Sequence, residues 1–578
     1  MEETSDKIGV QQLVAAFIAH GIKRIVFSPG SRNAPLVVAF ANDLRFETVV
    51  IPDERSAAFY ALGMAEESSR PVAVMCTSGS ALLNYYPAIS EAFYRNIPVV
   101  VVSADRPSEW VDQGDGQTIR QENVFKNHIC ASTTVYENPQ SEDQKWFNSR
   151  TIDEVLNTAK SNTGGPIHIN FPFNEPLYDR TDQPPEKKDD FIQQFELEPR
   201  LSSKQLTQLK NTWNTASKKL ILCGQIPNNS YLNEQLKQLA TDKSVAIVVE
   251  NTSNLQDRSF IHCIDRTISS FINDERSLFQ PDLLITLGAA VISKKIKNYL
   301  RSCQPKEHWK IGASFPFMDT YQSLSTTIPM NENSFIDVLL DDGVEFKRNI
   351  SRYGEQWKQL DYLVQEKHHN FIEAAPFCDL TVFDLILDTI PEKSNLHLAN
   401  SSVIRYAQLF DPIESISYYC NRGTSGIDGS VSSAIGHAIA GEDKLHTLIV
   451  GDMSFFYDSN AFWNHHVPSN VRIFLINNGG GGIFDIIPGP QKTPKGDEFF
   501  VAQHSFTASS ICDAFTINYK SANSLGDIEE QLQSFFEVQD NERPVLMEIF
   551  TDGKVSGATL NKYLEAVKVD DIPTLKSE

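Results

Sequence analysis

The feature that most constrains the fold of this chain is a repeated order of short apolar segment, turn and helix. Residues 72–76 are apolar throughout, a turn follows at 77–80, and 81–94 has a helical pattern before the next apolar segment at 97–103. Short segments that are apolar throughout are typical of strands buried on both faces of a parallel sheet. The helices between them supply the crossovers. We therefore predict an α/β protein with doubly wound, mainly parallel sheets.

This order recurs in three parts of the chain, whose 578 residues are too many for a single core. Further strands are predicted at 24–27, 46–51, 219–223, 283–287, 446–450, 471–476 and 545–549, and further helices at 54–68 and about 350–374. A polar, charged segment separates the first part from the second. We predict three α/β domains at 1–180, 201–350 and 380–578, with a linker at 181–200 and a helical connection at 351–379.

The overall charge limits the partners of the protein. The formal net charge is −23, which repels nucleic acid phosphates and anionic lipids. The longest apolar segments have strand length, so we expect no membrane span. The first ten residues lack the basic-then-apolar pattern of a secretory signal, and the eight cysteines form no CxxC pair or zinc spacing. We expect a cytoplasmic protein with reduced thiols, which would need local cations to hold an anionic substrate.

The sharpest chemical signal lies in the third part. Asp452 follows one predicted strand and Asn478 follows the next, 26 residues later, with four glycines behind it. A helix is predicted between them at 460–465. Open α/β sheets bind ligands at such carboxyl ends, and carboxylate, amide and carbonyl oxygens suit Mg²⁺. A helix cap followed by a tight turn is the alternative. No GxGxxG or GxxxxGK[ST] motif is present, which disfavours nicotinamide and P-loop enzymes.

This pattern resembles the cofactor motif of thiamine-diphosphate-dependent enzymes, although Met453 stands where the motif has glycine. The resemblance implies thiamine diphosphate bound with Mg²⁺, or with Mn²⁺ as a substitute. It implies Asp452, Asn478 and the carbonyl of Gly480 as metal ligands. Domain 1–180 would bind the pyrimidine and domain 380–578 the diphosphate. Because this family holds the two halves of the cofactor with different chains, a homodimer or homotetramer with active sites at the subunit interface is implied.

Glu54 is the candidate catalytic carboxylate. It follows the predicted strand 46–51 and begins a helix rich in small residues. Taken alone, it is an ordinary first-turn glutamate favoured by the helix dipole. The resemblance instead implies that it activates the cofactor through the aminopyrimidine, and that Ile427 holds the cofactor bent. The implied cofactor contacts are Glu54, Ser78, Gly79, Ile427, Gly451, Asp452, Asn478 and Gly480.

Several loops carry arginines beside glycine, proline or serine at predicted strand ends. They include SPGSRNAPL at 28–36, SADRP at 103–107 and NRGTSGIDG at 421–429. An isolated arginine is usually a surface charge, but guanidinium groups in such loops bind carboxylates bidentately. Together these segments resemble the 2-succinyl-5-enolpyruvyl-6-hydroxy-3-cyclohexene-1-carboxylate (SEPHCHC) synthase family, over nearly the whole chain. The implied substrate-binding residues are Ser31, Arg32, Arg106, Gln117, Lys294, Ser401, Arg405 and Arg422.

This resemblance implies a specific reaction in menaquinone biosynthesis. 2-Oxoglutarate would lose CO₂, and its succinyl unit would add to isochorismate in a 1,4-addition. The chain departs from the family pattern at Gly116, where asparagine is expected, and at Lys295, where arginine is expected. Three alternatives stay open: another thiamine-diphosphate-dependent 2-oxo acid decarboxylase or carboligase, a non-catalytic member of the fold, and a protein whose central domain holds a flavin.

Overall fold

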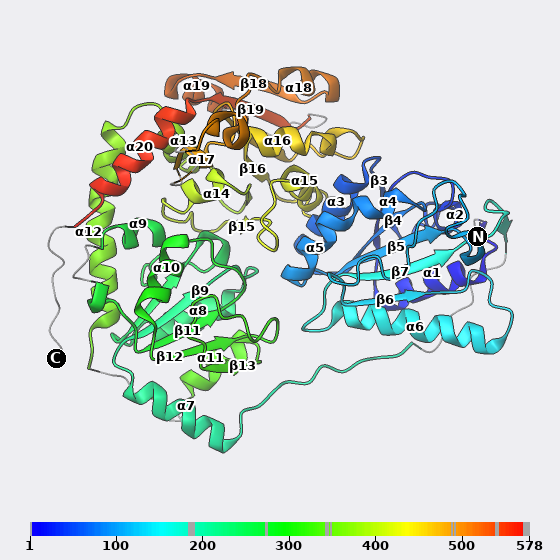
Figure 1. Cartoon of the computed structure of the whole chain (residues 1–578), viewed down its shortest axis with the longest axis horizontal. Helices are drawn as coiled ribbons and strands as arrows, with labels where there is room; N and C mark the ends of the chain where they lie inside the picture. The colour runs from blue at the N-terminus through cyan, green and yellow to red at the C-terminus, as the bar shows by residue number, and fades with distance from the viewer. Residues whose placement is uncertain are drawn as a thin grey trace.

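The computed structural model describes residues 3–182, 191–271, 276–341, 346, 350–486, 489, 493–537 and 543–569. These residues form three separate parallel sheets with helices on both faces, which confirms the prediction of three doubly wound α/β units (Figure 1). The N-terminal unit lies to one side. The central and C-terminal units are stacked beside it, and the long helix α12 (Tyr353–Ala374) runs along their outer edge.

The N-terminal sheet has the strand order β3-β2-β4-β5-β7-β6, and every neighbouring pair is parallel. Its strands are β2 (Arg24–Phe27), β3 (Glu47–Val50), β4 (Val72–Cys76), β5 (Val99–Asp105), β6 (Ala131–Thr134) and β7 (Ile167–Pro172). Its helices are α1 (Ile8–His20), α2 (Ala34–Phe40), α3 (Glu54–Ser68), α4 (Ser80–Asn84), α5 (Tyr86–Arg95) and α6 (Glu142–Lys160).

The central sheet, of order β10-β9-β11-β12-β13, is also parallel. Its strands are β9 (Lys219–Cys223), β10 (Val245–Val249), β11 (Leu283–Leu287), β12 (Glu307–Ile311) and β13 (Thr326–Ile328). Its helices are α7 (Ser203–Thr215), α8 (Ser230–Leu239), α9 (Ile264–Ser269), α10 (Lys294–Cys303) and α11 (Glu332–Leu340).

The C-terminal sheet, of order β15-β14-β16-β17-β19-β18, carries the cofactor motif. Its strands are β14 (Asn395–Leu398), β15 (Ser417–Tyr419), β16 (His446–Gly451), β17 (Val471–Asn477), β18 (Asn518–Ala522) and β19 (Val545–Phe550). Its helices are α13 (Asp379–Leu387), α14 (Ser402–Ala407), α15 (Ser430–Ala440), α16 (Asp452–Tyr457), α17 (Ile483–Ile486), α18 (Ser509–Phe515), α19 (Leu525–Phe535) and α20 (Gly553–Ala566).

Each buried strand feeds two cores, because successive side chains of a strand point to opposite faces. In β5, Val100 and Val102 join a core that belongs to the N-terminal domain alone. Val99 and Val101 join the other core, which continues through the central and C-terminal domains. Such a strand is apolar at nearly every position because both of its faces are buried.

Helices α3 and α15 connect the N-terminal and C-terminal domains, and they cross at very short range. A Cβ added at Gly63 would lie 2.1 Å from the carbonyl oxygen of Ser433, and one added at Gly436 would lie 2.3 Å from that of Tyr60. Backbone cannot move aside as a flexible side chain can, so only glycine permits this approach. The crossing places the start of α3 beside the C-terminal domain.

Several predicted elements differ from the structure. The predicted helix 460–465 is wrong. The helix α16 begins at Asp452, directly after β16, and a 3-10 turn follows at Ser459–Phe462. The predicted helix 81–94 is divided into α4 and α5 at Tyr85. The predicted linker begins with a short strand, β8 (Arg180–Thr181), which pairs antiparallel with β1 (Thr4–Ser5). Residues 183–190 of that linker lie outside the described residues.

Two further expectations can be compared with the structure. All eight cysteines are free, and six of them are buried, as predicted for reduced thiols. In the part of the chain that the structure describes, none of the helices combines the length and the apolar character that crossing a membrane requires.

Candidate active site

Asp452 begins α16 directly after β16, at the carboxyl edge of the C-terminal sheet. Its buried carboxylate accepts the backbone N–H groups of Gly479 and Gly480 through Oδ2, at 2.9 Å each, and that of Met453 through Oδ1, at 2.6 Å. His504 Nε2 lies 3.4 Å from Oδ2. Burial raises the pKa of Asp452 to about 6, although these N–H groups and His504 act in the opposite direction. The carboxylate thus joins the two strand ends that carry the motif.

Asn478 is oriented by a carboxylate that the sequence did not indicate. Its Nδ2 donates to Oδ2 of Asp379 at 3.0 Å. Asp379 is buried, accepts the Thr551 hydroxyl at 2.5 Å, and donates its own N–H to the Ser556 hydroxyl at 3.0 Å. An amide side chain has one donor end and one acceptor end. The bond to Asp379 fixes the nitrogen, so Oδ1 is the end that remains for a cation.

These groups fit a hard divalent cation bound to a diphosphate. Asp452 supplies one anionic oxygen, while Asn478 Oδ1 and the Gly480 carbonyl supply neutral ones. Gly480 has a φ of +148°, and a Cβ there would lie 2.6 Å from the carbonyl oxygen of Val501, so the close turn requires glycine. Among the described residues there is no group of three His, Cys, Asp or Glu side chains arranged for a metal. A cation here would therefore depend on amide and carbonyl oxygens.

Glu54 begins α3 at the carboxyl end of β3, where the side chain of Asp53 caps the helix by accepting the N–H of Ser56 at 3.0 Å. The Glu54 side chain is half-buried. It lies near Cys76 and Tyr85: burial raises the pKa of both groups, and the negative charge of Glu54 raises them further. The candidate catalytic carboxylate therefore faces a low-dielectric environment, in which its field is weakly screened.

The turn after β4, at residues 77–79, directly follows Cys76, which lies near Glu54. Ser78 is buried, and its hydroxyl has no hydrogen-bond partner among the described residues. Gly79 has a φ of +91°, donates its N–H to Gln121 Oε1 at 2.9 Å, and approaches the backbone of Gln117 so closely that a Cβ would lie 3.1 Å away. An unpartnered buried hydroxyl is costly unless a ligand completes it. This turn therefore fits a cofactor contact.

Arg32 and Arg106 form the cationic part of the N-terminal domain's site. Arg32 is buried, donates Nη1 to the carbonyl oxygen of Phe173 at 3.0 Å, and pairs with Glu175 at 3.2 Å. Arg106 pairs with Asp115 at 3.3 Å. Burial lowers the pKa of Arg32, and the positive charge of Arg106 lowers it further, so the two guanidinium groups are neighbours. The Nε atoms of both arginines are buried without a hydrogen-bond partner among the described residues.

The other two predicted residues of this loop region are exposed. Ser31 precedes Arg32, and Gln117 has a φ of +54°, a conformation that costs free energy in a residue with a side chain. Gly116, where asparagine was expected, accepts Nη2 of Arg106 through its carbonyl oxygen at 3.1 Å. A backbone acceptor thus contacts Arg106 at this position.

Arg405 and Arg422 form a second cationic group, in the C-terminal domain. Arg422 donates Nη1 to Asn400 Oδ1 at 2.7 Å, and its buried Nε has no partner among the described residues. Arg405 donates Nη1 to the carbonyl oxygen of Ser401. Burial lowers the pKa of Arg405, and the charge of Arg422 lowers it further. Ser401 has φ +77° and ψ −126°, a strained backbone of the kind that clusters at ligand sites.

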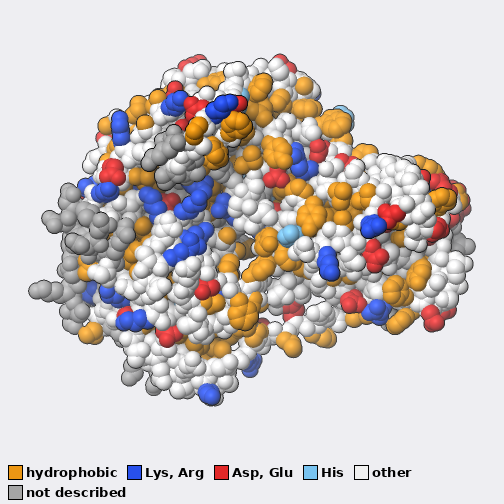
Figure 2. Space-filling model, in the orientation of Figure 1, with side chains coloured by type: hydrophobic (Ala, Val, Ile, Leu, Met, Phe, Trp, Pro, Cys, Tyr) orange, Lys and Arg blue, Asp and Glu red, His pale blue; other side chains and the backbone are white. Residues whose placement is uncertain are grey.

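The central domain adds cations to this second group. Lys294 is exposed at the start of α10. Burial lowers the pKa of Lys297, with Arg422, Arg301 and Arg405 contributing in the same direction and Glu250 opposing them. Lys297 is half-buried, and its charge interacts with those of Arg405 and Arg422. Figure 2 shows Lys and Arg side chains gathered on this face, over the region where α10 and α14 lie.

The predicted site residues therefore form two groups. The first, in the N-terminal domain, contains Ser31, Arg32, Glu54, Ser78, Gly79, Arg106 and Gln117; the second contains Lys294, Ser401, Arg405, Arg422, Ile427, Gly451, Asp452, Asn478 and Gly480. Among the described residues, no hydrogen bond or ion pair joins the two groups within the chain. Asp379 and His504 were missed, because both stand outside any recognisable motif.

Comparison with known proteins defines the class. Residues 8–125 match the family model "Thiamine pyrophosphate enzyme, N-terminal TPP binding domain", and residues 186–398 match "Middle domain of thiamine pyrophosphate". The structure is similar to that of the thiamine diphosphate-dependent 4-hydroxybenzoylformate decarboxylase of Rhodococcus jostii RHA1, with a TM-score of 0.69 over 94% of this chain and 99% of that one. At 17% identity this likeness concerns the fold. The chain is a thiamine-diphosphate-dependent enzyme.

The curated relatives narrow the class. The SEPHCHC synthase of Christiangramia forsetii is 43% identical over 96% of this chain and 98% of its own length. That of Flavobacterium johnsoniae is 42% identical over the same shares, and that of Bacteroides thetaiotaomicron is 37% identical over 98% and 99%. The chain belongs to the SEPHCHC synthase family, which confirms the resemblance predicted from its motifs.

Proposed function

We propose that this enzyme decarboxylates 2-oxoglutarate and adds the succinyl unit to isochorismate in a 1,4-addition, giving SEPHCHC and CO₂ in menaquinone biosynthesis. The observation that carries this proposal is the presence of two separate groups of arginines in a protein of net charge −23: buried Arg32 with half-buried Arg106, and half-buried Arg405 with Arg422. The two substrates together carry four carboxylates. Guanidinium groups with unpartnered N–H donors suit such ligands.

We propose roles for the chain's residues around the cofactor. When bound, thiamine diphosphate supplies a nucleophilic carbon and an electron sink for the departing CO₂. Glu54 holds a proton at the aminopyrimidine ring nitrogen. Asp452, Asn478 and the Gly480 carbonyl hold Mg²⁺, or Mn²⁺, against the diphosphate, with Gly451, Ser78, Gly79 and Ile427 as further cofactor contacts. The arginines orient the carboxylates of both substrates and stabilise charge that develops beside them.

We also propose that the active site is shared between two subunits of a homodimer or homotetramer. Arg55 Nη2 donates to the carbonyl oxygen of Tyr457, at the end of α16 opposite to Asp452. The start of α3 thus bonds to the far end of α16 in its own chain. No hydrogen bond or ion pair among the described residues joins Glu54 to Asp452 within the chain, which supports the proposal that Glu54 faces the Asp452 of another subunit. We also propose domain boundaries at residues 180, 200, 350 and 379. We propose that the enzyme is located in the cytoplasm.

The first experiment tests the reaction. Purified protein is mixed with thiamine diphosphate, Mg²⁺ and 2-oxoglutarate, and loss of isochorismate is followed together with release of CO₂. We expect both, with each dependent on all components. Release of CO₂ while isochorismate stays constant would show that the acceptor is wrong, and a pyruvate assay would then test the other decarboxylases and carboligases.

The second experiment tests the shared site. Glu54→Gln and Asp452→Ala subunits, each inactive as expected, are unfolded, mixed and refolded, with wild-type protein refolded in parallel as the control. In a mixed dimer one of the two sites is intact, so random mixing should restore about a quarter of the refolded wild-type activity. No recovery beyond the separate variants would contradict the shared site.

A further inference from the structure

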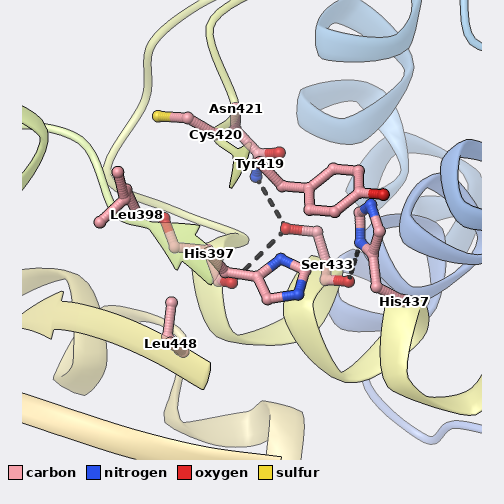
Figure 3. A pocket seen from close by; sticks show the side chains of 9 residues that line it. His397, Leu398, Tyr419, Cys420, Asn421, Ser433, His437 and Leu448 are labelled. Carbon is pink, nitrogen blue, oxygen red and sulfur yellow. Dashed lines mark hydrogen bonds between the residues drawn. The ribbon is translucent and has the colours of Figure 1, made fainter. Parts of the chain in front are cut away.

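The loop at 421–429 carries two predicted site residues, Arg422 and Ile427, and connects β15 to α15. Its first residue is fixed from two domains: Asn421 Nδ2 donates to the Ser433 hydroxyl at 3.0 Å and to the Gly429 carbonyl oxygen at 3.3 Å, and its Oδ1 accepts Nη1 of Arg95, on α5 of the N-terminal domain, at 3.5 Å. Figure 3 shows the Asn421–Ser433 bond beside a cavity of about 10 Å³, also lined by His397, Tyr419 and His437. The start of the loop is therefore anchored in a packed polar region.

The next residues of the loop are held by the N-terminal domain. Glu91 stands on α5 of the N-terminal domain and is 1% exposed. Its Oε1 accepts the N–H of Gly423 at 2.8 Å, and its Oε2 accepts the N–H and the hydroxyl of Thr424 at 2.6 and 2.9 Å. Arg95 lies on the same helix with its Nε 3.8 Å from Oε1. A buried carboxylate that accepts three donors from one loop restrains that loop strongly.

The contact is too close for any residue other than glycine at 423. A Cβ there would lie 2.6 Å from the carbonyl oxygen of Glu91 and 3.1 Å from the carbon of its carboxylate. Arg422 therefore stands between two anchored neighbours, Asn421 and Gly423. Its guanidinium keeps one bond, to Asn400, and a buried Nε with no partner among the described residues. The backbone is fixed while the side chain keeps donors for a ligand.

We propose that Glu91 is a positioning residue, which holds the 421–429 loop so that Arg422 and Ile427 lie correctly at the active site. This proposal rests on the substrate-binding role proposed for Arg422. Each N-terminal domain then acts on two sites: Glu54 completes the site of the partner subunit, and Glu91 shapes the site of its own chain. Glu91 acts only through its hydrogen bonds to the loop and its ion pair with Arg95, because its carboxylate is enclosed by both.

The competing explanation is that Glu91 merely stabilises the contact between the two domains. Glu66 provides a matched control. Its carboxylate lies at the same contact and pairs with Arg95 and His437, and none of its own bonds within the described residues reaches the 421–429 loop. Arg95 donates Nη1 to Asn421, so the comparison is read at Gly423 and Thr424, which bond to Glu91 and not to Glu66. Loss of a negative charge at this contact is thus common to both variants, whereas loss of the bonds to Gly423 and Thr424 is specific to Glu91→Gln.

The experiment compares wild type, Glu91→Gln and Glu66→Gln as full-length proteins loaded with thiamine diphosphate and Mg²⁺. Glutamine turns one acceptor oxygen into a donor, so at least one loop donor loses its partner. We expect exchange of the Gly423 and Thr424 amide hydrogens to accelerate about tenfold in Glu91→Gln, and KM for at least one substrate to rise about tenfold with a smaller change in kcat. Glu66→Gln should lower the melting temperature and leave exchange and KM as in wild type.

The outcomes are distinguishable. Wild-type exchange and KM in Glu91→Gln, or equal effects from Glu66→Gln, would overturn the positioning role. If wild type fails to consume isochorismate, the proposed function fails; the exchange comparison, with 2-oxoglutarate affinity measured by calorimetry in place of KM, then still decides the role of Glu91. If Glu91→Gln does not fold, Thr424→Val removes only the hydroxyl bond, and it should raise loop exchange and KM about threefold; unchanged values would overturn the proposal.

Discussion

The crossing of α3 and α15 predicts that Gly63→Ala separates the two halves of the enzyme. Ordinary van der Waals contacts begin near 3.4 Å, and the new Cβ would lie 2.1 Å from the Ser433 carbonyl oxygen, so the helices must move apart by about 1.3 Å. Alanine favours a helix over glycine by about 1 kcal/mol. Overpacking in a core costs typically about 1–3 kcal/mol, and here the obstacle is backbone, so we expect a net loss of about 2 kcal/mol.

The displacement should also reduce catalysis, because Glu54 begins α3 and Ile427 lies just before α15. A misplacement of about 1 Å can cost about a hundredfold in rate. The assay is thermal unfolding together with kcat, and the control is Gly526→Ala in α19, where the nearest atom is 3.9 Å from the new Cβ. The control should be neutral or more stable. Unchanged melting temperature and turnover in Gly63→Ala would refute the reasoning.

Three further predictions follow from single carboxylates. Glu54→Gln should bind thiamine diphosphate nearly normally in calorimetry yet lose turnover by about two orders of magnitude or more; near-normal turnover would remove Glu54 from the mechanism. Asp379→Ala should weaken Mg²⁺-dependent cofactor binding by about tenfold or more, because Asn478 can then present its nitrogen to the cation; calorimetry with wild-type affinity would contradict this. Burial alone would raise the pKa of Glu66, but Arg95 and His437 outweigh burial and lower this pKa from 4.5 to about 2. The ionised Glu66 side chain therefore stabilises the fold above pH 4.5, and this stabilisation is lost as the pH falls towards 2. Glu66→Gln should cost about 3 kcal/mol at pH 7, and denaturation at decreasing pH should show the difference narrowing below pH 4.5; a constant difference would exclude the charge as its cause.

The fold was predictable because its information is local. Residues 72–76 are apolar at every position, and 219–223 and 283–287 are apolar except at Lys219 and Thr286. Each of the three segments forms a strand with the predicted bounds. The helix at 460–465 was placed wrongly because its pattern is short. The preference of Asp452 for a first helical turn, where its charge meets the helix dipole, decided the start of α16 instead.

The proximity of the two motif strand ends was predictable for a related reason. Asp452 and Asn478 each follow a strand, and neighbouring parallel strands bring their carboxyl ends to one edge, so spacing along the chain becomes proximity in space. The arginines proposed to bind substrate were predicted from family blocks in loops. The structure showed which of these arginines are neighbours, and it added Lys297 to them. The sequence did not indicate Lys297, because the charged residues of α10 form a pattern typical of any solvated helix.

By itself the sequence determined the class of fold, the family and the identity of the cofactor motif, because these depend on local patterns of polarity and on short stretches of fixed spacing. Only the tertiary structure decided which carboxylates orient the site. Glu91 meets Gly423 from 332 positions away, and Asp379 meets Asn478 across 99. Such contacts arise from how helices pack between domains, and one glutamate in a helix looks like another until the opposing backbone is in place.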